Sequence, residues 1–111
     1  MNIPNFLYHA TFEPYMKSIG KIGLTGTNVI KTWSDSEEGV VYLANTPEES
    51  YSYAETSDDI PMEYLNQIVV LEIHTKNLDP DLFYLDSNNL DNNTFEYRGN
   101  ISPENIFRMK D

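Results

Sequence analysis

A glutamate on a late strand, a histidine near the start and a group of tyrosines are the side chains of this chain that could carry chemistry. Glu96 lies in NTFEYRG (93–99), where strand alternation puts Phe95 and Tyr97 on one face and Glu96 on the other. Glu96 then faces either solvent, beside Arg98, or a cleft. In a cleft, a fixed carboxylate can stabilise positive charge that develops in a transition state.

The histidine, His9, is followed by the small Ala10 and the hydroxyl of Thr11. A histidine at this position is either a core side chain with its hydrogen bonds satisfied or a functional group. A small neighbour favours function, because Ala10 lets a ligand approach the backbone amide and carbonyl closely. Both interpretations remain open from these residues alone.

The tyrosines lie in GVVYLANTPEESYSYAE (39–55), which reads as a strand entering a helix. Tyr42 lies in the strand, and Ser50 precedes Tyr53 by one helical turn, so a hydroxyl lies beside a flat ring. Two rings and a hydroxyl could sandwich a planar heterocycle and hydrogen-bond its substituent. The alternative is a tyrosine-rich packing stripe.

Other polar residues predict no chemistry. His74 ends a strand, and we find no carboxylate or histidine spaced to share a metal with it, so we expect a structural or exposed histidine. The acidic pairs at 37–38 and 58–59 fall in loop-like sequence and read as solvated. With no cysteine and only two histidines, we expect no metal site.

These residues need a scaffold, and the pattern predicts an α+β domain with the order β-α-β-α-β-β-β-β. Thr11 is placed to cap a helix over 12–23 that ends at Gly20 or Gly23, and Asn45 or Thr46 caps a helix that Pro47 begins. The polar stretches 34–39, 55–61 and 86–93 read as loops. The predicted strands are Asn5–His9, Val40–Ala44, 67–75, 82–86, 93–99 and 105–110, with 67–75 central because its apolar run is continuous.

Length and charge narrow the function. A chain of 111 residues predicts one domain over 1–111 with one site. Eighteen acidic and seven basic residues give a net charge of −11, which disfavours nucleic acid and anionic membrane as partners. We find no window apolar enough for a membrane span and no leader pattern, and we expect a cytoplasmic protein.

Taken together, LYHAT, VVYLANTPEESYSYAE and FEYRG resemble the ADP-ribosyltransferase superfamily, in its His-Tyr-Glu branch, which includes diphtheria toxin and the poly-ADP-ribose polymerases. GKIGLTG (20–26) is similar to a passage of the small bacterial DNA-targeting transferases. The resemblance covers nearly the whole chain. It implies a split, twisted mixed β-sheet with a few short helices and with NAD in the cleft between its halves.

The resemblance also implies roles for residues. His9 would hold the adenine-side ribose. The Ala10 backbone and the Ser50 hydroxyl would hold the carboxamide of nicotinamide. Thr11 would complete the His9-Ala10-Thr11 motif at the cofactor. Tyr42 and Tyr53 would sandwich the nicotinamide ring. Glu96 would hydrogen-bond the 2′-hydroxyl of the nicotinamide ribose and stabilise the oxocarbenium-like centre as nicotinamide leaves.

The acceptor stays open between a protein, a nucleic acid and a small molecule. Thr94 lies where arginine-modifying transferases carry an acidic residue, which disfavours arginine as acceptor. With Arg98 and Arg108 as the only arginines, the related RNA 2′-phosphotransferases fit poorly. The alternative functions are a non-enzymatic relative that binds NAD or ADP-ribose, and an acidic inhibitor that blocks a basic partner surface.

Overall fold

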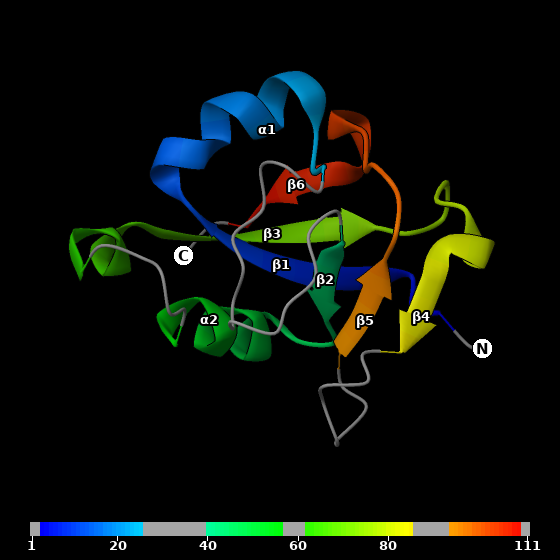
Figure 1. Cartoon of the computed structure of the whole chain (residues 1–111), viewed down its shortest axis with the longest axis horizontal. Helices are drawn as coiled ribbons and strands as arrows, with labels where there is room; N and C mark the ends of the chain where they lie inside the picture. The colour runs from blue at the N-terminus through cyan, green and yellow to red at the C-terminus, as the bar shows by residue number, and fades with distance from the viewer. Residues whose placement is uncertain (1–2, 26–39, 57–61, 86–93, 110–111) are drawn as a thin grey trace.

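The structure is a computed structural model that describes residues 3–25, 40–56, 62–85 and 94–109. Among them, six strands form one sheet in the order β4-β5-β2-β1-β3-β6 (Figure 1). The predicted α+β class is confirmed, and the strand for which we predicted a central place, β3, lies between β1 and β6. The strands and helices are β1 (Phe6–Phe12), η1 (Glu13–Tyr15), α1 (Met16–Ile22), β2 (Val41–Ala44), α2 (Pro47–Glu55), η2 (Met62–Gln67), β3 (Ile68–His74), η3 (Pro80–Leu82), β4 (Phe83–Leu85), β5 (Thr94–Tyr97), η4 (Pro103–Asn105) and β6 (Ile106–Arg108).

Every neighbouring pair of these strands is antiparallel, so the predicted mixed sheet is wrong in this respect. A parallel pair needs a crossover that returns the chain to the same end of the sheet. Here each strand runs in the opposite direction to its neighbours in the sheet.

The sheet consists of two three-stranded halves that meet over a very short ladder. β1 and β3 share seven register pairs and β2 and β5 share four, whereas β1 and β2 share the single pair Tyr8↔Ala44. Beyond that pair the two strands diverge. The half formed by β3, β1 and β6 is thereby set at an angle to the half formed by β2, β5 and β4 (Figure 1).

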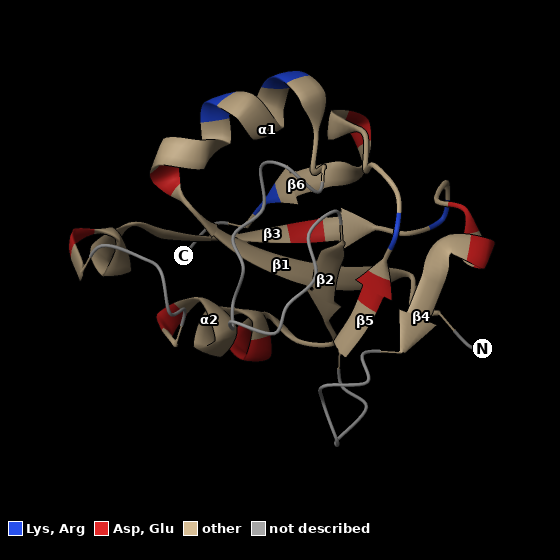
Figure 2. Cartoon of the chain, in the orientation of Figure 1, with Lys and Arg blue, Asp and Glu red and all other residues tan. Residues whose placement is uncertain are grey.

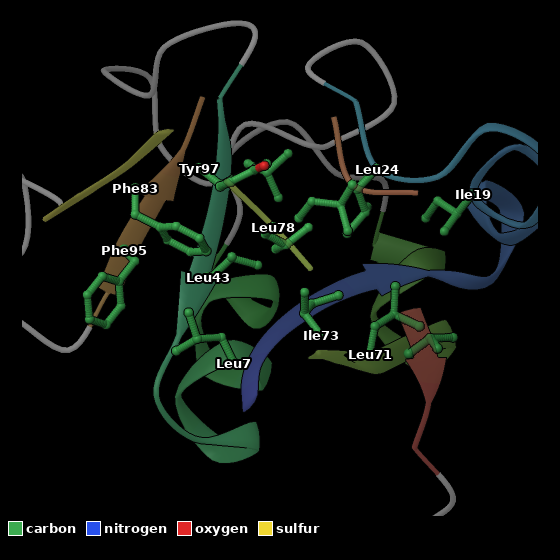
Figure 3. Close-up of a cluster of buried hydrophobic side chains, with 13 residues drawn as sticks. Leu7, Ile19, Leu24, Leu43, Leu71, Ile73, Leu78, Phe83, Phe95 and Tyr97 are labelled. Carbon is green, nitrogen blue, oxygen red and sulfur yellow. The ribbon is translucent and has the colours of Figure 1, made fainter. Parts of the chain in front are cut away.

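One face of the sheet carries the core. Residues opposite each other in register share a face, and on this face they are apolar: Leu7 opposes Ile73, and Leu43 opposes Phe95. Ile19 of α1 also belongs to this buried cluster (Figure 3). Burial of each such side chain contributes about 1.5–3 kcal/mol to folding. The core therefore joins the two halves that the backbone ladder barely connects.

Local signals explain most element ends. Thr46 caps α2 as predicted, since its hydroxyl accepts from the Glu49 amide, and Pro47 begins the helix. α1 ends at Gly23, whose φ of 81° suits a residue without a side chain. Thr11 does not cap a helix, because β1 continues to Phe12 and pairs Thr11 with Val69.

The predicted loop 34–39 and both acidic pairs, 37–38 and 58–59, lie outside the described residues, as do 57–61 of the second loop and all of 86–93. No helix in the described ranges has the length and apolar character needed to cross a membrane.

Candidate active site

Glu96 lies in the middle of a row of three side chains across β2, β5 and β4. In register it opposes Tyr42 on one side and Tyr84 on the other, so the three share the face opposite the core. The residue is only 5% exposed. The interpretation of Glu96 as a solvated carboxylate is therefore wrong, because its side chain is almost fully excluded from solvent.

Burial of this carboxylate is compensated by Arg98. Its Nη2 donates to Oε1 of Glu96 at 2.7 Å, and its guanidinium lies 5.2 Å from the centroid of the Tyr84 ring. A buried charge with a charged hydrogen-bond partner is tolerated, whereas an isolated one is not. The pair holds Oε1 in a fixed position next to Tyr42.

His9 fills the place where the two halves of the sheet separate. Its Nδ1 donates to the Tyr42 carbonyl at 2.9 Å, which gives that carbonyl a partner where the ladder between β1 and β2 has ended. Burial lowers the pKa of His9 below its usual 6.5, and the hydrogen bond to the Tyr42 carbonyl opposes this shift. The ring is therefore neutral near pH 7.

This tautomer leaves Nε2 of His9 as a hydrogen-bond acceptor. Nε2 is buried and has no hydrogen-bond partner, and the same holds for Oγ1 of Thr11, which projects from the same face of β1. Most buried polar atoms in folded proteins have partners. Two adjacent exceptions mark this part of β1 as a place where a ligand's polar groups could bind.

Helix α2 contributes a serine and a tyrosine on one side. Ser50 is 3% exposed and its hydroxyl donates to the Pro47 carbonyl at 2.8 Å, while the Tyr53 hydroxyl lies 2.8 Å from Oγ1 of Thr94. Thr94 precedes Glu96 by two residues and shares its face. Tyr53 is thus linked to the strand that carries Glu96.

The predicted site residues come from four separate segments, and the structure links most of them. Tyr42 and Glu96 are opposite each other, His9 contacts the Tyr42 backbone, and Tyr53 contacts β5. Ala10, half-buried and paired with Val70, lies just beyond the point where β1 and β2 part.

The site residues nevertheless project from two different faces of the sheet, because successive side chains of a strand alternate between its faces. His9 and Thr11 project from the core face, whereas Tyr42 and Glu96 project from the other. His9 therefore meets the rest of the site through its hydrogen bond to the backbone carbonyl of Tyr42.

The sequence analysis missed the contacts of two residues. It predicts Tyr84 only as part of the strand 82–86, yet Tyr84 lies beside Glu96. Likewise Glu72, two residues before His74, places Oε1 2.9 Å from Nε2 of that histidine, a contact that the sequence analysis, which considered only metal sharing, did not predict. Side chains two apart on a strand share a face, so the spacing of Glu72 and His74 was a usable signal.

No cluster of three potential metal ligands occurs among the residues that the structure describes. Comparison with models of protein families and with curated protein sequences gives no significant match.

Proposed function

We propose that this chain is a small NAD-dependent ADP-ribosyltransferase that transfers ADP-ribose from NAD to an acceptor and releases nicotinamide. The observation that carries the proposal is the meeting of Glu96 and Tyr42. A buried carboxylate lies directly opposite a tyrosine, at the point where the sheet divides and His9 bridges the two halves.

Each group is suited to its step. Cleavage of the bond to nicotinamide develops positive charge on the ribose, and a carboxylate held by Arg98 needs little reorganisation to stabilise it. Glu96 would accept a hydrogen bond from the 2′-hydroxyl through the oxygen that Arg98 leaves available. The unpartnered acceptor Nε2 of His9 is suited to a ribose hydroxyl.

Around the ring of nicotinamide, Tyr42 and Tyr53 would supply flat apolar surface. The Ser50 hydroxyl, which donates to the Pro47 carbonyl, keeps lone pairs that can accept from the carboxamide, and the backbone of Ala10 would complete that contact. The leaving nicotinamide carries the electron pair of the broken bond, and an acceptor nucleophile forms the new bond to the ribose.

The test is nicotinamide release from NAD by the purified chain. Glu96→Gln keeps the shape and the bond to Arg98 but removes the charge, and we expect the rate to fall by about 100-fold to 1000-fold. Glu104→Gln, the same change at an exposed site on η4, is the matched control and should keep the wild-type rate.

Binding of NAD, measured separately by calorimetry, distinguishes the alternatives. NAD binding without any release would replace the proposal with a non-enzymatic NAD-binding relative. If the chain neither binds NAD nor releases nicotinamide, the results would favour an acidic inhibitor of a basic partner. Release that Glu96→Gln leaves intact would show that the catalytic group was wrongly chosen.

A further inference from the structure

Three aromatic rings gather on the half of the sheet that does not carry Glu96. Phe6 of β1 opposes His74 of β3 with ring centroids 4.9 Å apart, edge to face, and Phe107 of β6 lies 4.2 Å from His74 at a small tilt. The three strands are adjacent (Figure 1). We call Phe6, His74 and Phe107 the aromatic patch.

The patch faces solvent and lies outside the core. Phe6 and Phe107 are each 47% exposed, and their face of the sheet is opposite to that of Leu7 and Ile73. Single exposed apolar side chains are ordinary, but a contiguous group on adjacent strands marks an interaction site. Because β6 is the last strand of the sheet, the patch is accessible from its edge as well.

Carboxylates adjoin these rings. Glu72 opposes Phe107 in register, its side chain is 31% exposed, and its Oε1 contacts His74. Tyr8, on the other side of Glu72, has a raised pKa because of burial first and the charges of Glu72 and Glu48 next. The raised pKa agrees with a negative potential along this side of the patch, and Figure 2 marks acidic residues on β3 and on α2.

The nearest arginine does not neutralise this potential. Arg108 follows Phe107 but opposes Leu71, so it projects from the core face, where its Nη2 lies 2.8 Å from Oε2 of Glu13. The chain as a whole carries a net charge of −11. Exposed aromatic faces beside a partly exposed carboxylate are the chemistry that binds an organic cation.

We propose that the aromatic patch and Glu72 bind an arginine side chain of a basic partner polypeptide. A guanidinium is planar, so it can stack on the exposed face of Phe107 or Phe6 and at the same time donate to a carboxylate edge. An ammonium group fits less well, because it is a compact and strongly hydrated point charge. Glu72 retains lone pairs for this bond while it contacts His74.

This binding site is separate from the proposed NAD chemistry and does not depend on it. Glu96 lies on β5, whereas the patch lies on β1, β3 and β6, in the other half of the sheet. A partner held at the patch would therefore leave the row of Tyr42, Glu96 and Tyr84 uncovered on its own half.

The probe is a fluorescein-labelled peptide of alternating arginine and serine with blocked ends, titrated with the full chain and followed by fluorescence anisotropy. The lysine version should bind more weakly, and the citrulline version, which keeps the shape without the charge, should not bind. Phe107→Leu keeps apolar volume but removes the ring face, and we expect it to weaken binding about two- to fivefold. Glu72→Gln should weaken binding by a similar factor.

Controls separate this site from general acidity. Tyr51→Ala removes an exposed ring on α2 and Glu104→Gln an exposed carboxylate on η4, and both should leave the affinity unchanged. Thermal melting checks that each variant is folded. The proposal is overturned if the peptide does not bind, if the controls weaken binding as much as Phe107→Leu does, or if lysine binds as well as arginine. A concentration-dependent dimer that Phe107→Leu dissociates would assign the patch to a second copy of this chain instead, and would equally overturn it.

Discussion

Glu96 and Glu72 occupy similar positions in the two halves of the sheet, yet their surroundings differ. Each lies opposite a tyrosine, Tyr42 for Glu96 and Tyr8 for Glu72, on the face away from the core. The side chain of Glu96 is 7% exposed and that of Glu72 is 31% exposed. Residue type and strand position are therefore shared, and only the neighbours decide what each carboxylate can do.

The partners of the two glutamates follow the same contrast. Arg98 holds the buried Glu96 at 2.7 Å, whereas His74 holds the more exposed Glu72 at 2.9 Å next to exposed rings. The first environment fixes the charge, as the proposed catalysis requires, and the second leaves a charge accessible to the proposed arginine partner. The exact position of the carboxylate should matter more for the function proposed for Glu96, and its charge should matter more for the binding proposed for Glu72.

Shortening each glutamate by one methylene gives the largest expected difference. Glu96→Asp keeps the charge but withdraws it by more than about 1 Å, and we expect nicotinamide release to fall about 100-fold. Glu72→Asp should weaken arginine-peptide binding less than Glu72→Gln does, because a half-exposed side chain can readjust. Equal sensitivity of the two functions to shortening would break the comparison.

A second test measures how strongly each pair is coupled in the folded state. A double-mutant cycle with Arg98→Met and Glu96→Met, each of which removes the ion pair, should give a coupling of about 1–2 kcal/mol in urea unfolding, moderated by the exposure of Arg98. The matched cycle with His74→Phe, which keeps an aromatic ring, and Glu72→Met should give about 0.5 kcal/mol or less. If the second coupling reached the first, burial would not be what separates the regions.

The smallest expected effect is a pH dependence that originates at His9. Burial lowers the pKa of His9 in the folded chain. Below about pH 6.5 the histidine therefore binds a proton more readily in the unfolded chain than in the folded one. The free energy of unfolding is therefore unaffected by His9 above about pH 6.5, and below that pH it decreases by at most about 1.4 kcal/mol per pH unit. His9→Asn keeps a donor for the Tyr42 carbonyl and should reduce this slope, as measured by urea unfolding between pH 5 and 7 (chosen to span about 6.5). An unchanged slope in the variant would exclude His9 as its source.

Local patterns predicted the elements well because their signals are local. The run from Ile68 to Leu71 predicted a central strand, and β3 is an inner strand next to the edge strand β6; Thr46 with Pro47 marked the start of α2. Thr11 misled for the same reason: its type suits a helix cap, but pairing with Val69, far along the chain, keeps it in β1. The preference of threonine for a helix cap was overridden by strand pairing with Val69, which the sequence around Thr11 does not reveal.

The site divides in a similar way. The predicted set of His9, Tyr42 and Glu96 came from a resemblance, and the contacts that join them depend on register between distant strands. The role of Arg98 could be suspected from its spacing to Glu96 on one strand. The burial of Glu96 and the meeting of Phe6 with Phe107 could not, because each requires knowing which strands are neighbours.

The two halves of the sheet are interleaved along the chain, with β1, β3 and β6 in one and β2, β4 and β5 in the other. Neither half is a continuous piece of polypeptide. During synthesis, β1 must wait for β3 and β2 must wait for β5; the half with β2, β4 and β5 is complete only at Tyr97, and the other half only at Arg108. Such long-range pairing slows folding. Shortening the chain before β5 would therefore take a strand from both halves at once.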